Sequence, residues 1–182
     1  SSILGHIMHI LNRELFSGGI CMPYDRSKAV TYAHKWAFKR NPAYGDFSEM
    51  GGDCTNFISQ CILAGGASMN YIPNTGWYYR SMNNRAPSWT GVEFLYRFLI
   101  TNKGKGPYAV TAPASDMRPG DVVQLSFNGG RNFGHSLFVV ETGYPPQNSN
   151  IMIATHSYDS DYRPLDSWEN VIYRYIHISG TR

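Results

Sequence analysis

The stretch GGDCTNFISQC, residues 51–61, decides the fold because it places Cys54 at the start of an apolar helix. Two glycines and Asp53 precede this helix, which we expect to cover residues 54–63 and to stop at the glycines after Ala64. The first amide groups of a helix lack intrahelical partners, and about half a positive charge concentrates there. Such a position stabilises a thiolate, so we predict a lowered thiol pKa and a nucleophilic role for Cys54.

A thiol nucleophile needs a base, and the base needs a group that holds its ring. His135 opens a predicted strand directly after Gly134, and His156 ends the following strand. Because a hairpin brings the start of one antiparallel strand beside the end of the next, we predict a line of Cys54, His135 and His156. The N–H groups at the helix start would then face the oxyanion that forms when sulfur attacks a carbonyl.

The alternative is that each cysteine is a small buried hydrophobe, which is the common state of free cysteine. Cys61 fits this description between Ile58 and Ile62, whereas Cys54 has polar neighbours. Together with Cys21, the chain has three cysteines, so they cannot all pair with one another. Seven helical residues span about 10 Å, which puts Cys54 and Cys61 beyond disulfide reach and leaves at least one thiol free.

The remaining histidines lie in amphipathic or alternating patterns and are interpreted as surface or packing residues: His6, His9, His34 and His177. His6 and His9 have helical i, i+3 spacing, but nothing nearby supplies a third ligand, and the chain has no CxxC pair. No metal site and no organic cofactor are therefore predicted.

A long segment rich in Gly, Asn, Pro and aromatic residues covers residues 66–89 and is expected to form an irregular loop. Loops of this length usually serve a site. Trp77 and Trp89 could form an aromatic wall of a substrate cleft, and they could equally hold the loop down.

The composition is that of one globular domain. The chain has 182 residues, of which 42% are hydrophobic and 16% charged, against roughly 25% charged in soluble proteins generally. The net charge of +3 is modest and the basic residues are scattered, which excludes a nucleic-acid stripe. Residues 3–16 are too short and too polar to span a membrane, and they lack the order of a signal peptide.

The pattern along the chain predicts helices first and strands afterwards, which is an α+β layout with an antiparallel meander. Helices are expected at residues 3–16, 25–40, 54–63 and 90–100, with Asp25 as an N-cap. Strands are expected at residues 120–127, 135–141, 151–156 and 171–178.

Five segments in this order resemble the putative amidase domain of bacteria, within the NlpC/P60-like, papain-fold cysteine peptidase superfamily: YDRSKAVTYAHKWAFKRNPAYGDF, GGDCTNFISQCILAGGASM, GDVVQL, GHSLFVVE and THSYDSDYRPL. The resemblance begins at about Tyr24, so we expect an N-terminal helical extension at residues 1–23 and an amidase-like catalytic domain at residues 24–182. It implies a papain-like α+β fold in which the nucleophile helix packs on a small antiparallel sheet.

Carried over residue by residue, the resemblance implies that Cys54 is the nucleophile and His135 the base. His156 matches the third, polar residue, with Asp159 and Asp161 as alternatives for orienting His135. Residues upstream of the cysteine are the source of oxyanion support in that superfamily. The resemblance makes Tyr24 the candidate for that support, and Asp53 is expected to cap the helix and brace its loop.

The implied activity is cysteine-dependent hydrolysis of an amide or peptide bond through a thioester, in bacterial cell-wall peptide. The alternatives are acyl transfer to an amine and a non-hydrolytic cell-wall-binding module on the same fold. A peptide or peptidoglycan-type partner outside the cell or in its envelope follows by analogy. Residues 1–23 could pack on the domain or mediate self-association or partner docking through an apolar face formed by Ile3, Ile7, Ile10 and Leu11.

Overall fold

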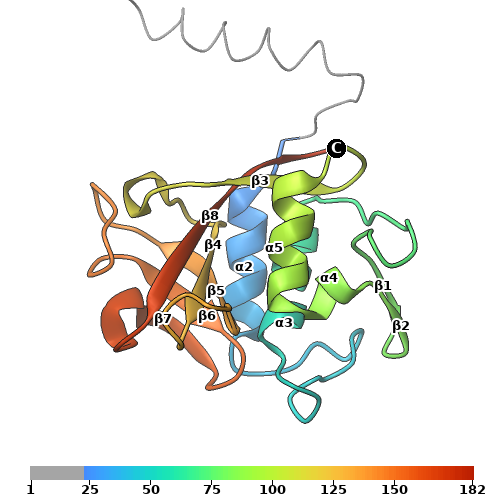
Figure 1. Cartoon of the computed structure of the whole chain (residues 1–182), viewed down its shortest axis with the longest axis horizontal. Helices are drawn as coiled ribbons and strands as arrows, with labels where there is room; N and C mark the ends of the chain where they lie inside the picture. Colours follow the sequence, from blue (N-terminus) through green and yellow to red (C-terminus); the bar gives the residue numbers. More distant parts are fainter. Residues whose placement is uncertain (1–22) are drawn as a thin grey trace, which may run out of the picture.

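The α-helices gather on one face of an antiparallel sheet in the computed structural model, which describes residues 23–182 (Figure 1). The helix predicted at residues 3–16 lies outside the described part. The helices are α2 (Arg26–Trp36), α3 (Cys54–Ala64), the short α4 (Pro87–Thr90) and α5 (Val92–Thr101). Within residues 23–182, no helix combines the length and apolar character needed to cross a bilayer.

The main sheet has six strands in the order β3-β8-β4-β5-β6-β7, and every neighbouring pair is antiparallel. The strands are β3 (Pro107–Thr111), β4 (Val122–Ser126), β5 (His135–Glu141), β6 (Met152–Thr155), β7 (Ser160–Pro164) and β8 (Ile172–Thr181). The predicted meander holds from β4 to β7. It is wrong for β8, because the last strand returns between β3 and β4.

Strands β3 and β7 were not predicted, and both lie at the edges of the sheet. The β7 sequence SDYRP has no buried residue, because only one face of an edge strand meets the protein interior. An edge strand therefore needs little apolar alternation, and its pattern resembles that of a loop.

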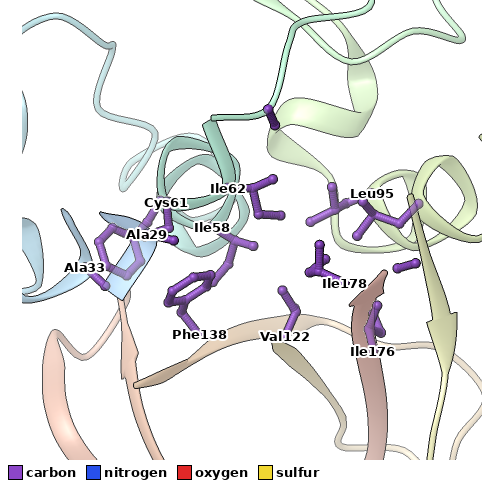
Figure 2. Close-up of a cluster of buried hydrophobic side chains, with 14 of the residues drawn as sticks. Ala29, Ala33, Ile58, Cys61, Ile62, Leu95, Val122, Phe138, Ile176 and Ile178 are labelled. Carbon is purple, nitrogen blue, oxygen red and sulfur yellow. The ribbon is translucent and has the colours of Figure 1, made fainter. Parts of the chain in front are cut away.

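Helix α3 is surrounded by protein on all sides, with residues 54–62 all buried. Such a helix is apolar or hydrogen-bonded all round, without an exposed stripe. Ile58 points toward Phe138 of the sheet and Ile62 toward Leu95 of α5, whereas Cys61 lies on the side of Ala29 in α2 (Figure 2). Cys61 is fully buried in this cluster, which confirms its prediction as a core residue.

The sheet is apolar on both faces, so neighbouring residues of one strand serve different cores. Val122 and Phe138 face the helices, whereas Val123 and Leu137 belong to a second cluster on the opposite face. This alternation has period two and fixes which side chains of β5 and β6 can meet.

The helix predicted at residues 90–100 is α5, which begins after Gly91, and the short helix α4 that precedes Gly91 was not predicted. The segment at residues 66–89 is less irregular than predicted. It contains a two-stranded hairpin, β1 (Tyr79–Ser81) and β2 (Asn84–Arg85), and a single bridge between Asn70 and Trp77. Asp25 caps α2 as predicted, because its carboxylate accepts the Lys28 N–H at 3.0 Å.

Candidate active site

Cys54 is the first residue of α3, and its side chain contacts the beginning of strand β5. The residue is 7% exposed, and its sulfur lies 3.8 Å from the Thr55 hydroxyl. The backbone N–H of Ser136 also donates toward the sulfur. Because Ser136 follows His135 directly, the fold brings the predicted nucleophile and the strand that carries the predicted base together. Among residues 23–182, no hydrogen bond joins the Cys54 thiol to the His135 ring.

Burial raises the pKa of the Cys54 thiol above its usual value, although hydrogen bonds from Ser136 and Thr55 act in the opposite direction. The negative charge of Asp53 raises it further. The prediction of a lowered thiol pKa is therefore wrong for the resting protein. The helix N-terminus favours the thiolate, but the loss of water around the sulfur outweighs it.

His135 is the first residue of β5 and is 8% exposed. Burial lowers its pKa from the usual 6.5 to about 4, and the positive charge of Arg163 contributes to the decrease. The ring is therefore neutral at neutral pH and is able to accept a proton.

Thr155, which the sequence analysis did not single out, holds the ring of His135. Its hydroxyl oxygen lies 3.3 Å from His135 Nε2, and its proton points to backbone carbonyls, including that of Ser136 at 2.9 Å. The oxygen is thus free to accept a proton from Nε2–H. That tautomer leaves Nδ1 of His135 as the basic nitrogen.

His156 lies on the other face of the sheet from this contact. Its Nδ1 is 2.5 Å from Asp53, its Nε2 is 2.7 Å from the Trp36 carbonyl, and its ring stacks on Phe57. Both ring nitrogens are engaged away from His135. The structure therefore does not bring together the predicted line of Cys54, His135 and His156, because successive strand residues point to opposite faces.

The two alternative carboxylates also lie away from His135. Asp159 receives a bidentate ion pair from Arg40 at 2.8 and 3.1 Å, and Asp161 contacts His34 at 2.8 Å. Both pairs connect the β6–β7 hairpin to helix α2 and its C-terminal segment. The two aspartates after His156 therefore have a structural role, because they hold this hairpin against α2.

Asp53 braces the loop that precedes Cys54. Its carboxylate accepts the Phe47 N–H and the Asn56 side-chain amide, each at 2.9 Å, in addition to its contact with His156. Its side chain makes no capping bond to the helix backbone, which differs from the predicted cap. The position of the nucleophile is thus fixed through a fully buried carboxylate.

Tyr24 lies at the opposite end of α3 from Cys54. Its ring lies against Gly65, which ends the helix, and its hydroxyl donates to the Gly120 carbonyl at 2.9 Å. Eleven helical residues separate the two ends by about 16 Å. The prediction that Tyr24 supports an oxyanion at Cys54 is therefore wrong.

Trp77 and Trp89 are fully buried and form no cleft wall. Their indole N–H groups donate to Ser59 and Asn56 of α3 at 3.1 and 2.9 Å, and their rings lie 4.8 Å apart. The alternative interpretation, in which the tryptophans hold the long loop down, describes these contacts.

A cavity of about 420 Å³ opens beside His135. Its lining includes Phe127, Ser157, Tyr158, Arg163 and Trp168. The hydroxyl of Ser157 also accepts the Asp53 N–H at 3.4 Å, so this lining reaches the residue before Cys54. The sequence did not indicate the cavity because its walls come from five separate places along the chain with no common motif. Within residues 23–182, no three metal-ligating side chains are grouped.

The fold and site define an α+β protein with a buried cysteine at a helix start, packed on an antiparallel sheet whose adjoining strand begins with histidine. Residues 23–178 match the family described as "Putative amidase domain", and the chain belongs to that family. The description of the family indicates amide hydrolysis in general.

The chain is also similar to the uncharacterized protein YhbB of Bacillus subtilis (strain 168), with 38% identity over 155 residues. The similar region covers 83% of this chain and 46% of the relative, so the chain spans about half the length of that protein. No solved structure matches the chain significantly.

Proposed function

We propose that this protein is a cysteine-dependent amide hydrolase of papain-like, NlpC/P60-like type, with Cys54 as nucleophile and His135 as base. One observation carries the proposal: the Cys54 sulfur lies in the first turn of α3 and meets the backbone of Ser136, the neighbour of His135. In this proposal, Thr155 is the residue that orients the ring of His135.

In the first step, Cys54 attacks the carbonyl carbon of the substrate amide. The raised thiol pKa and the lowered histidine pKa favour a neutral pair at rest, so His135 Nδ1 takes the thiol proton as the sulfur–carbon bond forms. The negative charge moves to the carbonyl oxygen. The free N–H groups in the first turn of α3 are the donors available to stabilise it.

In the second step, the carbon–nitrogen bond breaks and His135 gives its proton to the departing amine, which leaves a thioester on Cys54. The same ring then accepts a proton from water as the hydroxide oxygen attacks the thioester carbonyl. The acid product leaves, and the proton returns from His135 to the Cys54 sulfur.

The substrate class that we propose is a peptide of the bacterial cell wall. Its support is the resemblance of the motifs around Cys54 and His135 to a superfamily whose members commonly cut such peptides, and the similarity to a Bacillus protein. Fold similarity alone does not determine a substrate.

The test is digestion of peptidoglycan and purified muropeptides by the intact chain, with products identified by mass and by their new amino groups. Cys54→Ala should yield no product and should keep the native thermal transition. Cys61→Ala, a matched change in the same helix, should still cleave. Equal product from the Cys54→Ala protein would overturn the proposed nucleophile, and faster turnover with added amines would indicate acyl transfer instead of hydrolysis.

A further inference from the structure

The cavity beside His135 contains a positive charge that the proposed chemistry does not use. Arg163, on β7, lines the cavity together with His135. The carboxylates of the same hairpin, Asp159 and Asp161, are paired with Arg40 and His34. Among the described residues, Arg163 has no acidic partner, and no acidic side chain lines the cavity.

The guanidinium of Arg163 is held in one orientation. Its Nε donates to the Ser167 hydroxyl at 2.7 Å, and its central carbon lies 3.6 Å from the centre of the Trp168 ring. Within residues 23–182, its two terminal nitrogens donate to no protein acceptor. A fixed pair of parallel N–H donors matches the two oxygens of a carboxylate.

The other walls of the cavity suit a peptide. Phe127 and Tyr158 are largely exposed aromatic side chains. Ser157 and Tyr158 both have φ of +64°, a conformation in which non-glycine residues cost free energy and which often occurs at functional sites. This turn holds Ser157 against the Asp53 N–H and Tyr158 at the mouth of the cavity.

The field of Arg163 reaches the proposed base, since it contributes to the low pKa of His135. An anion bound to Arg163 would therefore lie within electrostatic range of the reacting groups.

We propose that Arg163 forms a carboxylate-binding subsite, so that the enzyme selects peptides with a free carboxylate near the amide bond to be cleaved. This inference rests on the proposed function and adds the chemical class of its substrate. The carboxylate would accept both terminal N–H groups of Arg163, and the adjacent chain would lie against Tyr158 and Phe127.

The experiment measures binding, so it is independent of cleavage. Cys54→Ala protein is titrated calorimetrically with N-acetyl-alanyl-alanine and with the same dipeptide as its C-terminal amide. A charge-assisted pair predicts that the acid binds about tenfold more tightly than the amide. In the double variant that adds Arg163→Gln, this ratio should fall to about one. Arg97→Gln removes an exposed charge from α5 and should keep the ratio.

Arg163→Lys keeps the charge but loses the two-donor fork, so it should retain only part of the preference for the acid. The Arg163 Nε–H resonance should also shift on addition of the acid and not of the amide. An unchanged ratio in Arg163→Gln, or no binding of the acid at millimolar concentration, would overturn the subsite. If Cys54→Ala protein still cleaved peptides while Arg163 controlled this ratio, the proposed nucleophile would fail and the subsite would stand.

Discussion

Burial sets the resting protonation of the two residues on which the chemistry depends. It raises the pKa of Cys54 and lowers that of His135, so both are neutral at neutral pH. A desolvated pair avoids the cost of holding two charges in the interior before substrate arrives. The proton transfer is then coupled to the attack on the carbonyl.

The low pKa of His135 predicts a specific loss of stability in acid. The unfolded chain binds a proton near the usual pKa of 6.5, whereas the folded protein does so only near pH 4. Stability from this group is therefore complete above pH 6.5 and is lost as the pH falls toward 4. At 1.36 kcal/mol per pKa unit, the loss is about 3 kcal/mol.

Urea denaturation at pH 7, 5.5 and 4 measures this effect. Between pH 7 and pH 4, the free energy of unfolding of the wild type should fall by about 3 kcal/mol more than that of His135→Gln. Parallel decreases for the two proteins would mean that His135 titrates normally in the folded state.

Thr155 is predicted to act as a positioning residue through its contact with His135 Nε2. Thr155→Val keeps the shape of the side chain and removes the acceptor, so kcat should fall about tenfold or more, with little change in KM. Thr155→Ser should recover most of the rate because it restores the hydroxyl. A Val variant with normal kcat, or a Ser variant as slow as Val, would exclude this role.

At the scale of elements, strand β6 is an example of a contact that the sequence pattern could not predict. Local patterns correctly placed Cys54 at a helix start and His135 at a strand start, because caps, glycines and apolar period are local signals. The pattern did not say which face of β6 would meet His135. Period two puts Thr155 beside His135 and His156 against Phe57.

Properties that depend on packing between distant elements could not be predicted. The raised thiol pKa follows from burial of Cys54 where the start of α3 packs on β5. The position of Tyr24 follows from how α2 docks on the sheet. The edge strands β3 and β7 also lacked a clear period. The buried strands and the helices α2, α3 and α5 are segments bounded by Gly, Pro, Asn or Asp, and they were predicted to within a few residues.

The pair of Asp53 and His156 is expected to stabilise the loop before the nucleophile. His156→Ala removes one partner of a buried carboxylate that keeps Arg40 at 3.4 Å, and it should reduce the free energy of unfolding by about 1.5–3 kcal/mol. His34→Ala removes a similar but partly exposed histidine from its contact with Asp161 and should cost under about 1 kcal/mol. Equal costs in urea denaturation would show that burial of the first pair has no special effect.

At the scale of the whole molecule, Asp121 joins the helical layer to the sheet. Its fully buried carboxylate accepts the Arg26 guanidinium at 2.7 Å and the backbone N–H groups of Arg118 and Ile178 at 2.8 and 2.9 Å, and it contacts His177. Asp121 belongs to the GDVVQL motif and links α2, β8 and the start of β4. The motif thus has a structural role in holding the domain together.

Asp121→Ala should reduce the free energy of unfolding by about 3 kcal/mol or more, because it removes the carboxylate partner of Arg26 and leaves the backbone N–H groups of Arg118 and Ile178 without their acceptor. Asp25→Ala, which removes the cap of the same helix α2, should cost only about 1 kcal/mol. Thermal and urea unfolding of the two variants give the comparison. Similar costs would indicate that Asp121 is not the main link between the layers.

The central claim is that an acyl group passes through the sulfur of Cys54. Mass spectrometry of protein quenched in acid during turnover of a muropeptide tests it directly. We predict a mass increase equal to the acyl half of the substrate, located by fragmentation at Cys54 and not at Cys61, and absent from Cys54→Ala. Turnover by the Cys54→Ala protein, or an acyl group located on another residue, would contradict the account.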